Sequence, residues 1–501
     1  MDDRTSILTL SNELLRDILD QIEADPEKLV SIDRRQYLSV ESFKPPKPPE
    51  QSQAQDVANF RLVCRRFSEL GVPHQFARIT LRFSRAGFDR LDRICGEERL
   101  ARHTKKFSYM IPSFYAQGRD RIQDLIDASG ATHLNSTVLI RKAQDQDDII
   151  RSGLDLRILK KAMRAFTSLQ HVQLLRLQDR ADQELLAFMD SQDEPMTQLV
   201  DLKWTPACIH ATKTVGQALI AAKSSFNRFS APMMNPQSAL ELRTHLGPVS
   251  FLAERLTCLE LHFDAGFDLD DRMRDLSGLC RTIFYAAKGM QAVHLGFPSR
   301  LPLNLRLEEV FHNVRWERLR AFGIQAWKLD ASEIIDFARR HRKTLKGLRL
   351  RDVLLREGSM WKDVLFMLHE EMESLDWVSL RRIDYVQHFD EIHNGTIELP
   401  DDPLWGSSES DDEEDIGPYP AADDDYDDIT DSDEWSDEAE NDYGPGANAL
   451  ALAPDTPASV SWSATSRGSF KIRCPEDLGD DGYEVRYQQR KMWEAWVASN
   501  R

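Results

Sequence analysis

The stretch LTCLEL, residues 256–261, places apolar side chains at positions i, i+3 and i+5. The alternation at its end is typical of a β-strand with one buried face. The same spacing recurs at intervals of 26 to 34 residues. It begins at Leu169, Leu199, Phe226, Leu256, Met290, Leu319, Leu345 and Met372, and an earlier strand is expected at 105–111.

Most of these segments follow a stretch with the spacing of an amphipathic helix, such as 276–289 and 331–345. A strand and a helix that alternate at a nearly constant interval indicate a repeat architecture with parallel strands. We therefore expect an α/β fold over residues 84–397, with an insertion at about 112–150. The alternative is an ordinary α/β domain whose strands happen to be evenly spaced.

This spacing resembles the leucine-rich repeat, which implies an irregular solenoid of alternating helices and short parallel strands. That family usually has Asn or Cys three positions after the last leucine of the strand. The corresponding positions here hold Leu177, Ala207, Met234, Asp264, Pro298, Trp327, Val353 and Leu380. Because none of them fits, we do not expect the regular horseshoe curvature of the family.

Polar residues between the apolar strand positions are expected to lie on the opposite face of the sheet. In a leucine-rich-repeat-like body, that face would contact a protein substrate. The candidate substrate-binding residues are Gln173, Lys203, Glu260, His262, His294, Gln325, Arg349, Arg351 and Asp376.

Residues 1–83 have a different pattern. A stripe from Leu10 to Ile22 predicts a first helix, and a proline-rich connector occupies about 24–56. The stretch NFRLVCRRFSELG, residues 59–71, then predicts one helix that starts after Asp56 and stops at Gly71, before Pro73. This helix is apolar on two sides, which suggests two packing partners. We expect a partner to meet Phe60, Val63, Cys64 and Phe67, while Val57, Leu62 and Leu70 face elsewhere.

The two helical segments together resemble the F-box, in the form found in filamentous fungi. Leu10, Glu13, Leu14, Leu15, Ile18 and Leu19 match its first half, and Leu62, Val63, Cys64, Arg65 and Phe67 match its second half. Two departures are Ser11, where the family usually has Pro, and the long insertion between the halves.

The resemblance implies a substrate-recognition subunit of a Skp-cullin-F-box ubiquitin ligase, without chemistry of its own. The F-box would bind a Skp-type adaptor and, through it, a cullin. The residues expected at that contact are Leu10, Leu14, Leu15, Ile18, Leu19, Phe60, Leu62, Val63, Cys64 and Phe67. Packing within the core of the F-box itself is the alternative for each of these residues.

The net charge of −19 is local. Residues 383–466 contain 25 Asp and Glu and no Lys or Arg, which leaves 58 acidic and 64 basic residues elsewhere. We expect residues 398–460 to be disordered, because such a charged segment cannot bury a core. Residues 461–501 are expected to form a short helix that docks on the body through Tyr483, Tyr487, Trp493 and Trp496, or a free tail.

A second hypothesis follows from this acidic segment. The protein would be an interaction scaffold without a ligase role, using its repeat body and the acidic segment. Ser408, Ser410 and Thr430 each have an acidic residue three positions later and are candidate phosphorylation sites.

Other function classes find little support in the sequence. It lacks a P-loop, a GxSxG elbow and an HExxH motif, so we expect no enzymatic activity, cofactor or metal. No apolar run approaches the roughly 20 residues of a membrane span. Six dispersed cysteines and an acidic N-terminus favour the cytoplasm or nucleus. The basic run 339–343 suits the end of a helix, and nucleic acid is not an expected partner.

Overall fold

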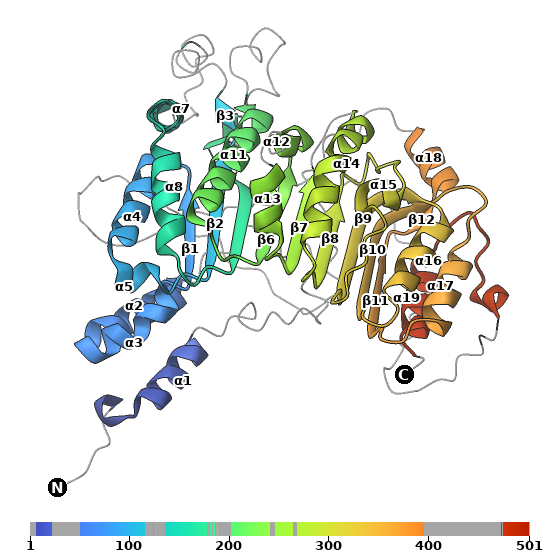
Figure 1. Cartoon of the computed structure of the whole chain (residues 1–501), viewed down its shortest axis with the longest axis horizontal. Coiled ribbons are helices and arrows are strands. Elements are labelled where there is room, and N and C mark those ends of the chain that lie inside the picture. Colours follow the sequence, from blue (N-terminus) through green and yellow to red (C-terminus); the bar gives the residue numbers. More distant parts are fainter. Residues whose placement is uncertain are drawn as a thin grey trace.

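The computed structural model describes residues 7–22, 51–115, 136–177, 202–240, 246–263, 268–394 and 474–499, with a few isolated positions between them. Its framework is an α/β arrangement on one large parallel sheet (Figure 1). This confirms the predicted fold class in its coarse form. The predicted disordered segment, 398–460, and the three candidate phosphorylation sites lie outside the described residues.

The main sheet has ten strands, and nine of them lie side by side in the order in which they occur along the chain. All neighbouring pairs are parallel. The strands are β1 (Arg78–Arg82), β2 (Lys106–Pro112), β4 (His171–Leu177), β6 (Arg228–Met234), β7 (Cys258–Phe263), β8 (Ala292–Gly296), β9 (Ala321–Leu329), β10 (Gly347–Leu355), β11 (Trp377–Arg381) and β12 (Asp384–Tyr385), of which β12 extends the pairing with β10. The sheet therefore begins before the predicted boundary at residue 84.

Helices connect the strands and lie over one face of the sheet (Figure 1). Such crossovers are what a parallel pairing requires. They are α4 (Arg85–Gly96), α5 (Glu98–Ala101), α8 (Leu154–Ala165), α11 (Trp204–Ala222), α12 (Pro236–Leu240), α13 (Leu246–Ala253), α14 (Leu269–Ala286), α15 (Leu307–Phe311), α16 (Ala331–Arg340) and α17 (Trp361–Glu370). Two further helices, α7 (Ser136–Ser152) and α18 (Val386–Asn394), lie near one end of the strands.

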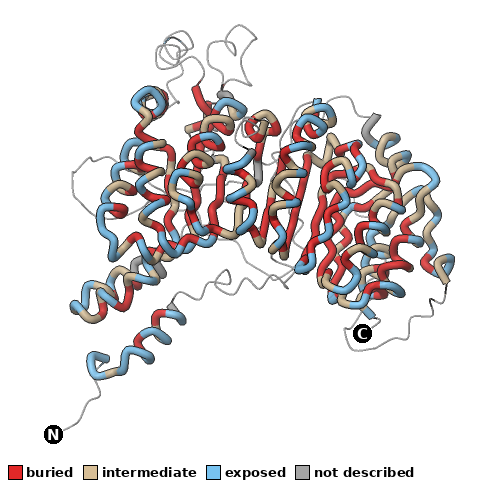
Figure 2. The backbone as a smooth tube through the Cα atoms, viewed as in Figure 1, coloured by how far each residue is buried: buried red, intermediate tan, exposed pale blue. Residues whose placement is uncertain are grey.

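The apolar strand positions form the core between the sheet and these helices. In the repeat around β9, Leu319, Phe322 and Ile324 are all buried, and Phe322 stacks on Phe337 of α16 at 3.9 Å between ring centroids. One continuous apolar cluster extends from β1 to β11 (Figure 2). The i, i+3, i+5 spacing is thus explained by burial of one strand face together with the turn that enters the strand.

Three neighbouring strands share a left-handed backbone position near their ends. Ala326, Asp352 and Arg382 have φ angles of 55°, 51° and 46°, and they occupy equivalent positions on β9, β10 and the end of β11. This left-handed conformation turns the following residue inward. The residues that follow, Trp327, Val353 and Ile383, are buried. Apolar packing therefore occupies the place where the leucine-rich-repeat family has a polar side chain bonded to the turn.

Two predicted strands are wrong in position. In the segment from Leu199, the described residues Leu202–Lys203 form β5, which pairs antiparallel with β3 (Phe114–Tyr115) in a separate small sheet and not with the main sheet. The segment from Met372 is displaced by three residues, because the buried triplet is Leu375, Val378 and Leu380. In both cases, another set of apolar residues nearby happens to have the i, i+3, i+5 spacing.

The C-terminal segment covers the last strand. Helix α19 (Tyr487–Val497) packs on β11 and α17, and Trp493 and Trp496 are buried there. The carboxylate of Glu494 accepts a hydrogen bond from the backbone N–H of Leu380, which would otherwise be an open donor at the sheet edge. The docked helix is confirmed, but Tyr483 and Tyr487, which were expected to help anchor it, are exposed.

The second predicted N-terminal helix is two helices. After α1 (Asn12–Ile22), α2 (Gln51–Val63) ends at the extended residue Cys64, and α3 (Arg65–Gln75) continues through Pro73. The break allows Phe60 and Phe67 to stack at 4.4 Å, which a continuous helix would prevent because it would hold the rings two turns apart. Pro73 lies inside α3 and has no N–H to donate to the carbonyl oxygen of Glu69, so this helix forms with one backbone hydrogen bond fewer.

Candidate interaction surfaces

The three N-terminal helices form an apolar cluster that is separate from the main core. Buried side chains of α1, α2 and α3 meet there: Leu15, Leu19, Val57, Phe60, Phe67 and Leu70. Arg66 joins α3 to α1, since its guanidinium donates to the carbonyl oxygens of Leu8 (3.1 Å) and Leu10 (2.6 Å) and to Asn12 Oδ1 (2.8 Å). The start of α1 is therefore fixed beside the break between α2 and α3.

Five large apolar side chains remain exposed around this cluster. Leu62 is 81 % exposed, Val63 55 % and Leu14 50 %, and Ile7 and Leu8 are also exposed. Single exposed apolar residues are common, but five of them on the segments that form one small cluster indicate a candidate interaction site.

This distribution corrects the predicted faces of the second helix. Phe60 and Phe67, which were expected to meet a partner, are buried in the cluster. Leu62 is the most exposed, although the helical spacing placed it on another face and only the F-box resemblance placed it at the adaptor contact. The break at Cys64 changes the helical phase between the two halves, so the spacing within a single helix does not apply. Of the other predicted contact residues, Leu15 and Leu19 are buried, Leu10, Ile18 and Cys64 are half-buried, and Leu14 and Val63 are exposed.

The face of the sheet opposite the helices carries most of the predicted substrate-binding residues. Strand pairing aligns Gln173, Glu260, His294 and Arg349 in one row across the sheet, together with Ser108 and Ser230. The next row contains His262, Gln325 and Arg351. We call these two rows the polar rows. The structure thus brings together seven of the predicted residues.

The other two predicted residues lie elsewhere. Lys203 belongs to β5 in the small antiparallel sheet, and Asp376 is exposed just before β11, where it pairs with Lys346 at 3.5 Å. Both positions belong to the two segments whose strand assignment is wrong. The alternation of side chains predicted for those segments therefore does not apply.

The polar rows are buried, which the sequence did not predict. Gln173, Glu260, His262, His294, Arg349 and Arg351 are all at most 7 % exposed, and only Gln325 is half-buried. Glu260 Oε2 accepts a hydrogen bond from Arg228 Nη2 at 2.7 Å, whereas Glu260 Oε1 has no hydrogen-bond partner among the described residues. A buried carboxylate oxygen without a donor is costly and is therefore a natural place for a donor from a ligand.

Burial keeps the histidines of this face neutral. Desolvation lowers the pKa of His262 to about 4, and nearby Arg351 adds to the effect. Burial also lowers the pKa of His294 well below its usual value, with repulsion from His262 as the next cause. Burial likewise lowers the pKa of His171 well below its usual value, and its Nε2 lies 2.5 Å from the hydroxyl oxygen of Ser230. These rings therefore act as neutral hydrogen-bonding groups at pH 7.

The low pKa of His262 predicts that acid destabilises the fold. Between about pH 6.5 and 4, the unfolded chain binds a proton at this ring and the folded chain does not, so stability falls as the pH falls through this window. We expect a loss of about 2–3 kcal/mol between pH 7 and 4.5 from this residue. Denaturant unfolding of the wild type and of His262→Gln at both pH values measures it, and equal pH dependence of the two chains would contradict it.

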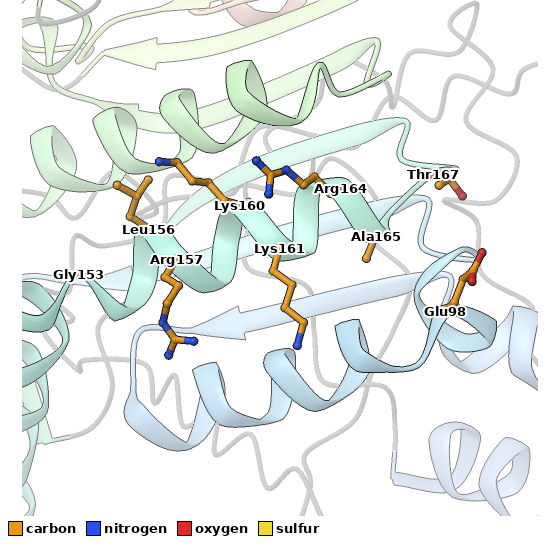
Figure 3. A pocket seen from close by; sticks show the side chains of 9 residues that line it. All are labelled: Glu98, Gly153, Leu156, Arg157, Lys160, Lys161, Arg164, Ala165 and Thr167. Carbon is orange, nitrogen blue, oxygen red and sulfur yellow. The ribbon is translucent and has the colours of Figure 1, made fainter.

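A basic groove was missed in the sequence. Arg157, Lys160, Lys161 and Arg164 lie on the exposed side of α8 and line a depression of about 690 Å³, with Glu98 of α5 at its edge. Figure 3 shows Arg157 and Lys161 pointing from α8 toward α4, while Lys160 and Arg164 point to the other side. We call this the α8 groove. The sequence could have indicated it, because these four cations have the spacing i, i+3, i+4 and i+7, which places them on one side of a helix.

Comparison with family models and with curated proteins finds no match to this chain. Within the described ranges, no group of three or more His, Cys, Asp and Glu side chains is arranged to hold a metal ion. Across those same ranges, no helix is both long and apolar enough to cross a membrane.

Proposed function

We propose that this protein is a substrate-recognition subunit of a Skp-cullin-F-box ubiquitin ligase. Helices α1 to α3 bind a Skp-type adaptor, and the repeat body binds a protein substrate. The observation that carries the proposal is the exposure of Leu62, Val63 and Leu14 on a cluster that already has its own buried core. Side chains that the cluster does not need for its own packing are available to a second chain.

We also infer that the body is an irregular, leucine-rich-repeat-like solenoid. Three observations support this: strands that neighbour one another in chain order, one helical layer, and a shared left-handed position on β9, β10 and β11. In a solenoid, each repeat contacts mainly its neighbours, so the end repeats need covers. Helix α19 fits that role at β11.

The polar rows are the proposed substrate surface. They combine acidic, basic and neutral side chains on adjacent strands, and Glu260 Oε1 offers an acceptor that has no donor. Because most of these side chains are buried, a substrate must uncover them in order to bind. Such a role requires no catalytic group in this chain.

Co-purification with a Skp-type adaptor tests the proposed function. The full chain, shown to be folded by circular dichroism, is expected to form a stable complex with purified adaptor on size-exclusion chromatography. A folded chain that does not bind the adaptor at micromolar concentration would refute the ligase assignment. That result would favour the interaction scaffold, in which the body and the acidic segment bind partners without an adaptor.

A further inference from the structure

The α8 groove presents positive charge that its surroundings do not neutralise. Among the described residues, Arg157, Lys160 and Arg164 have no ion-pair partner, and Lys161 alone is paired, with Asp92 at 2.8 Å. The opposite side of α8 is apolar and buried in the main core. Helix packing therefore explains the apolar side of α8, but it does not explain the row of cations on the exposed side.

In the basic run at 339–343, by contrast, two cations are paired with carboxylates. Arg339 pairs with Glu371 at 2.6 Å, and Arg342 pairs with Glu373 at 3.2 Å. Arg340 donates to Asn313 Oδ1 at 2.7 Å. Acidic and amide groups from adjoining segments thus bind Arg339, Arg340 and Arg342, which are three of the four Lys and Arg residues of the run. In the α8 groove, Glu98 lies at the edge and Asp92 pairs with Lys161, but Arg157, Lys160 and Arg164 have no such partner among the described residues. The groove is therefore the stronger candidate for binding an anionic partner.

We propose that the α8 groove binds the acidic segment of the same chain, residues 401–442. This segment contains 20 Asp and Glu and no Lys or Arg. Its charge is complementary to the groove, and its covalent attachment gives it a high effective concentration there, in the millimolar range for short linkers. The contact is electrostatic, so it weakens as salt is added.

Chain length permits this contact. Helix α18 ends at Asn394 beside β10 and β12, and α8 leads into β4. Five inter-strand steps separate β10 from β4, which is roughly 24 Å at about 4.8 Å per step. About 30 residues connect Asn394 to the acidic run at 423–428, and a chain of that length spans up to about 100 Å.

Zero-length cross-linking of the full chain tests the proposal. A carbodiimide joins lysine amines to carboxylates in contact, so Lys160 and Lys161 are expected to link to peptides from 401–442. The double variant Arg157→Glu, Arg164→Glu keeps both lysines but reverses two charges, and we expect it to lower the yield of these links about tenfold. The matched control Lys288→Glu, Arg318→Glu changes two exposed cations outside the groove and is expected to leave the yield within about twofold.

Two outcomes would overturn the proposal. One is equal cross-link yield in the groove variant and the control, which would indicate non-specific attraction. The other is the finding that, in an equal mixture of ¹⁴N- and ¹⁵N-labelled chains, the links join only different chains and never two segments of one chain.

Competition with a free peptide is an independent measurement. A fluorescent peptide of residues 407–442 is expected to bind a full chain whose acidic residues at 401–442 are changed to Asn and Gln. It should bind the wild type about tenfold more weakly, because there the groove is already occupied. Equal binding to both chains would also overturn it.

Discussion

In a chain that carries Leu62→Asp and Val63→Asp, capture of a Skp-type adaptor is expected to fall by about a hundredfold or more while the fold is retained. Both side chains are more than half exposed, so an aspartate in either position remains solvated in the free protein. In a complex, the same carboxylates would be buried in an apolar contact without partners, which is strongly unfavourable. Biolayer interferometry with purified adaptor measures the change in affinity.

Two comparisons make this prediction specific. Phe251→Asp on α13 changes another exposed apolar residue, which is 42 % exposed, and should leave adaptor affinity unchanged. Phe67→Ala removes a ring from the buried N-terminal cluster, so it should act by unfolding that cluster and be visible by circular dichroism. If the double aspartate variant binds as well as the wild type, the exposed residues are not the contact.

Replacing Trp493 with Ala is expected to lower the free energy of unfolding of the C-terminal end of the sheet by about 3–5 kcal/mol. The indole is fully buried between α19 and the body, and its Nε1 donates to the carbonyl oxygen of Leu478 at 3.0 Å. Its loss leaves a cavity and an unpaired acceptor. Because α19 also covers the edge of β11 through Glu494, hydrogen exchange in residues 377–385 should become faster as well.

Tyr487→Ala is the matched control for Trp493. Tyr487 lies on the same helix but is 54 % exposed, so we expect a change within about 0.5 kcal/mol. Denaturant unfolding followed by circular dichroism measures both variants, and exchange of the 377–385 peptide localises the effect. An equally small effect in Trp493→Ala would mean that α19 does not stabilise the edge of the sheet.

The alternation of strands and helices was predictable because its signal is local. Burial of one strand face requires alternating apolar residues, and this pattern correctly located six of the eight predicted strands of the main sheet. The prediction failed at Leu199 and at Met372, where nearby apolar residues served a two-stranded sheet or a turn instead. Local spacing does not identify which of two overlapping apolar sets will be buried.

The N-terminal surface was predictable only in part. Its residues could be assigned to helices by their periodicity, but the choice between core and exposed positions depended on the break at Cys64. Nothing in local propensity requires a break there. It follows from the stacking of Phe60 on Phe67 and from the bonds of Arg66 to the start of α1, which are contacts between segments distant along the chain.

By itself, the sequence determined the α/β class, the interval of the repeats, the placement of polar residues on one sheet face and the concentration of acidic charge near the C-terminus. These properties depend on periodicity and composition, which are local. Only the tertiary structure decided that Leu62 is exposed while Phe67 is buried, and that the polar rows are buried. It also decided that Arg157, Lys160 and Arg164 have no ion-pair partner among the described residues, while Arg339 and Arg342 each have one. Exposure and charge pairing depend on which distant segments come together, and this cannot be predicted from the spacing of residues along the chain.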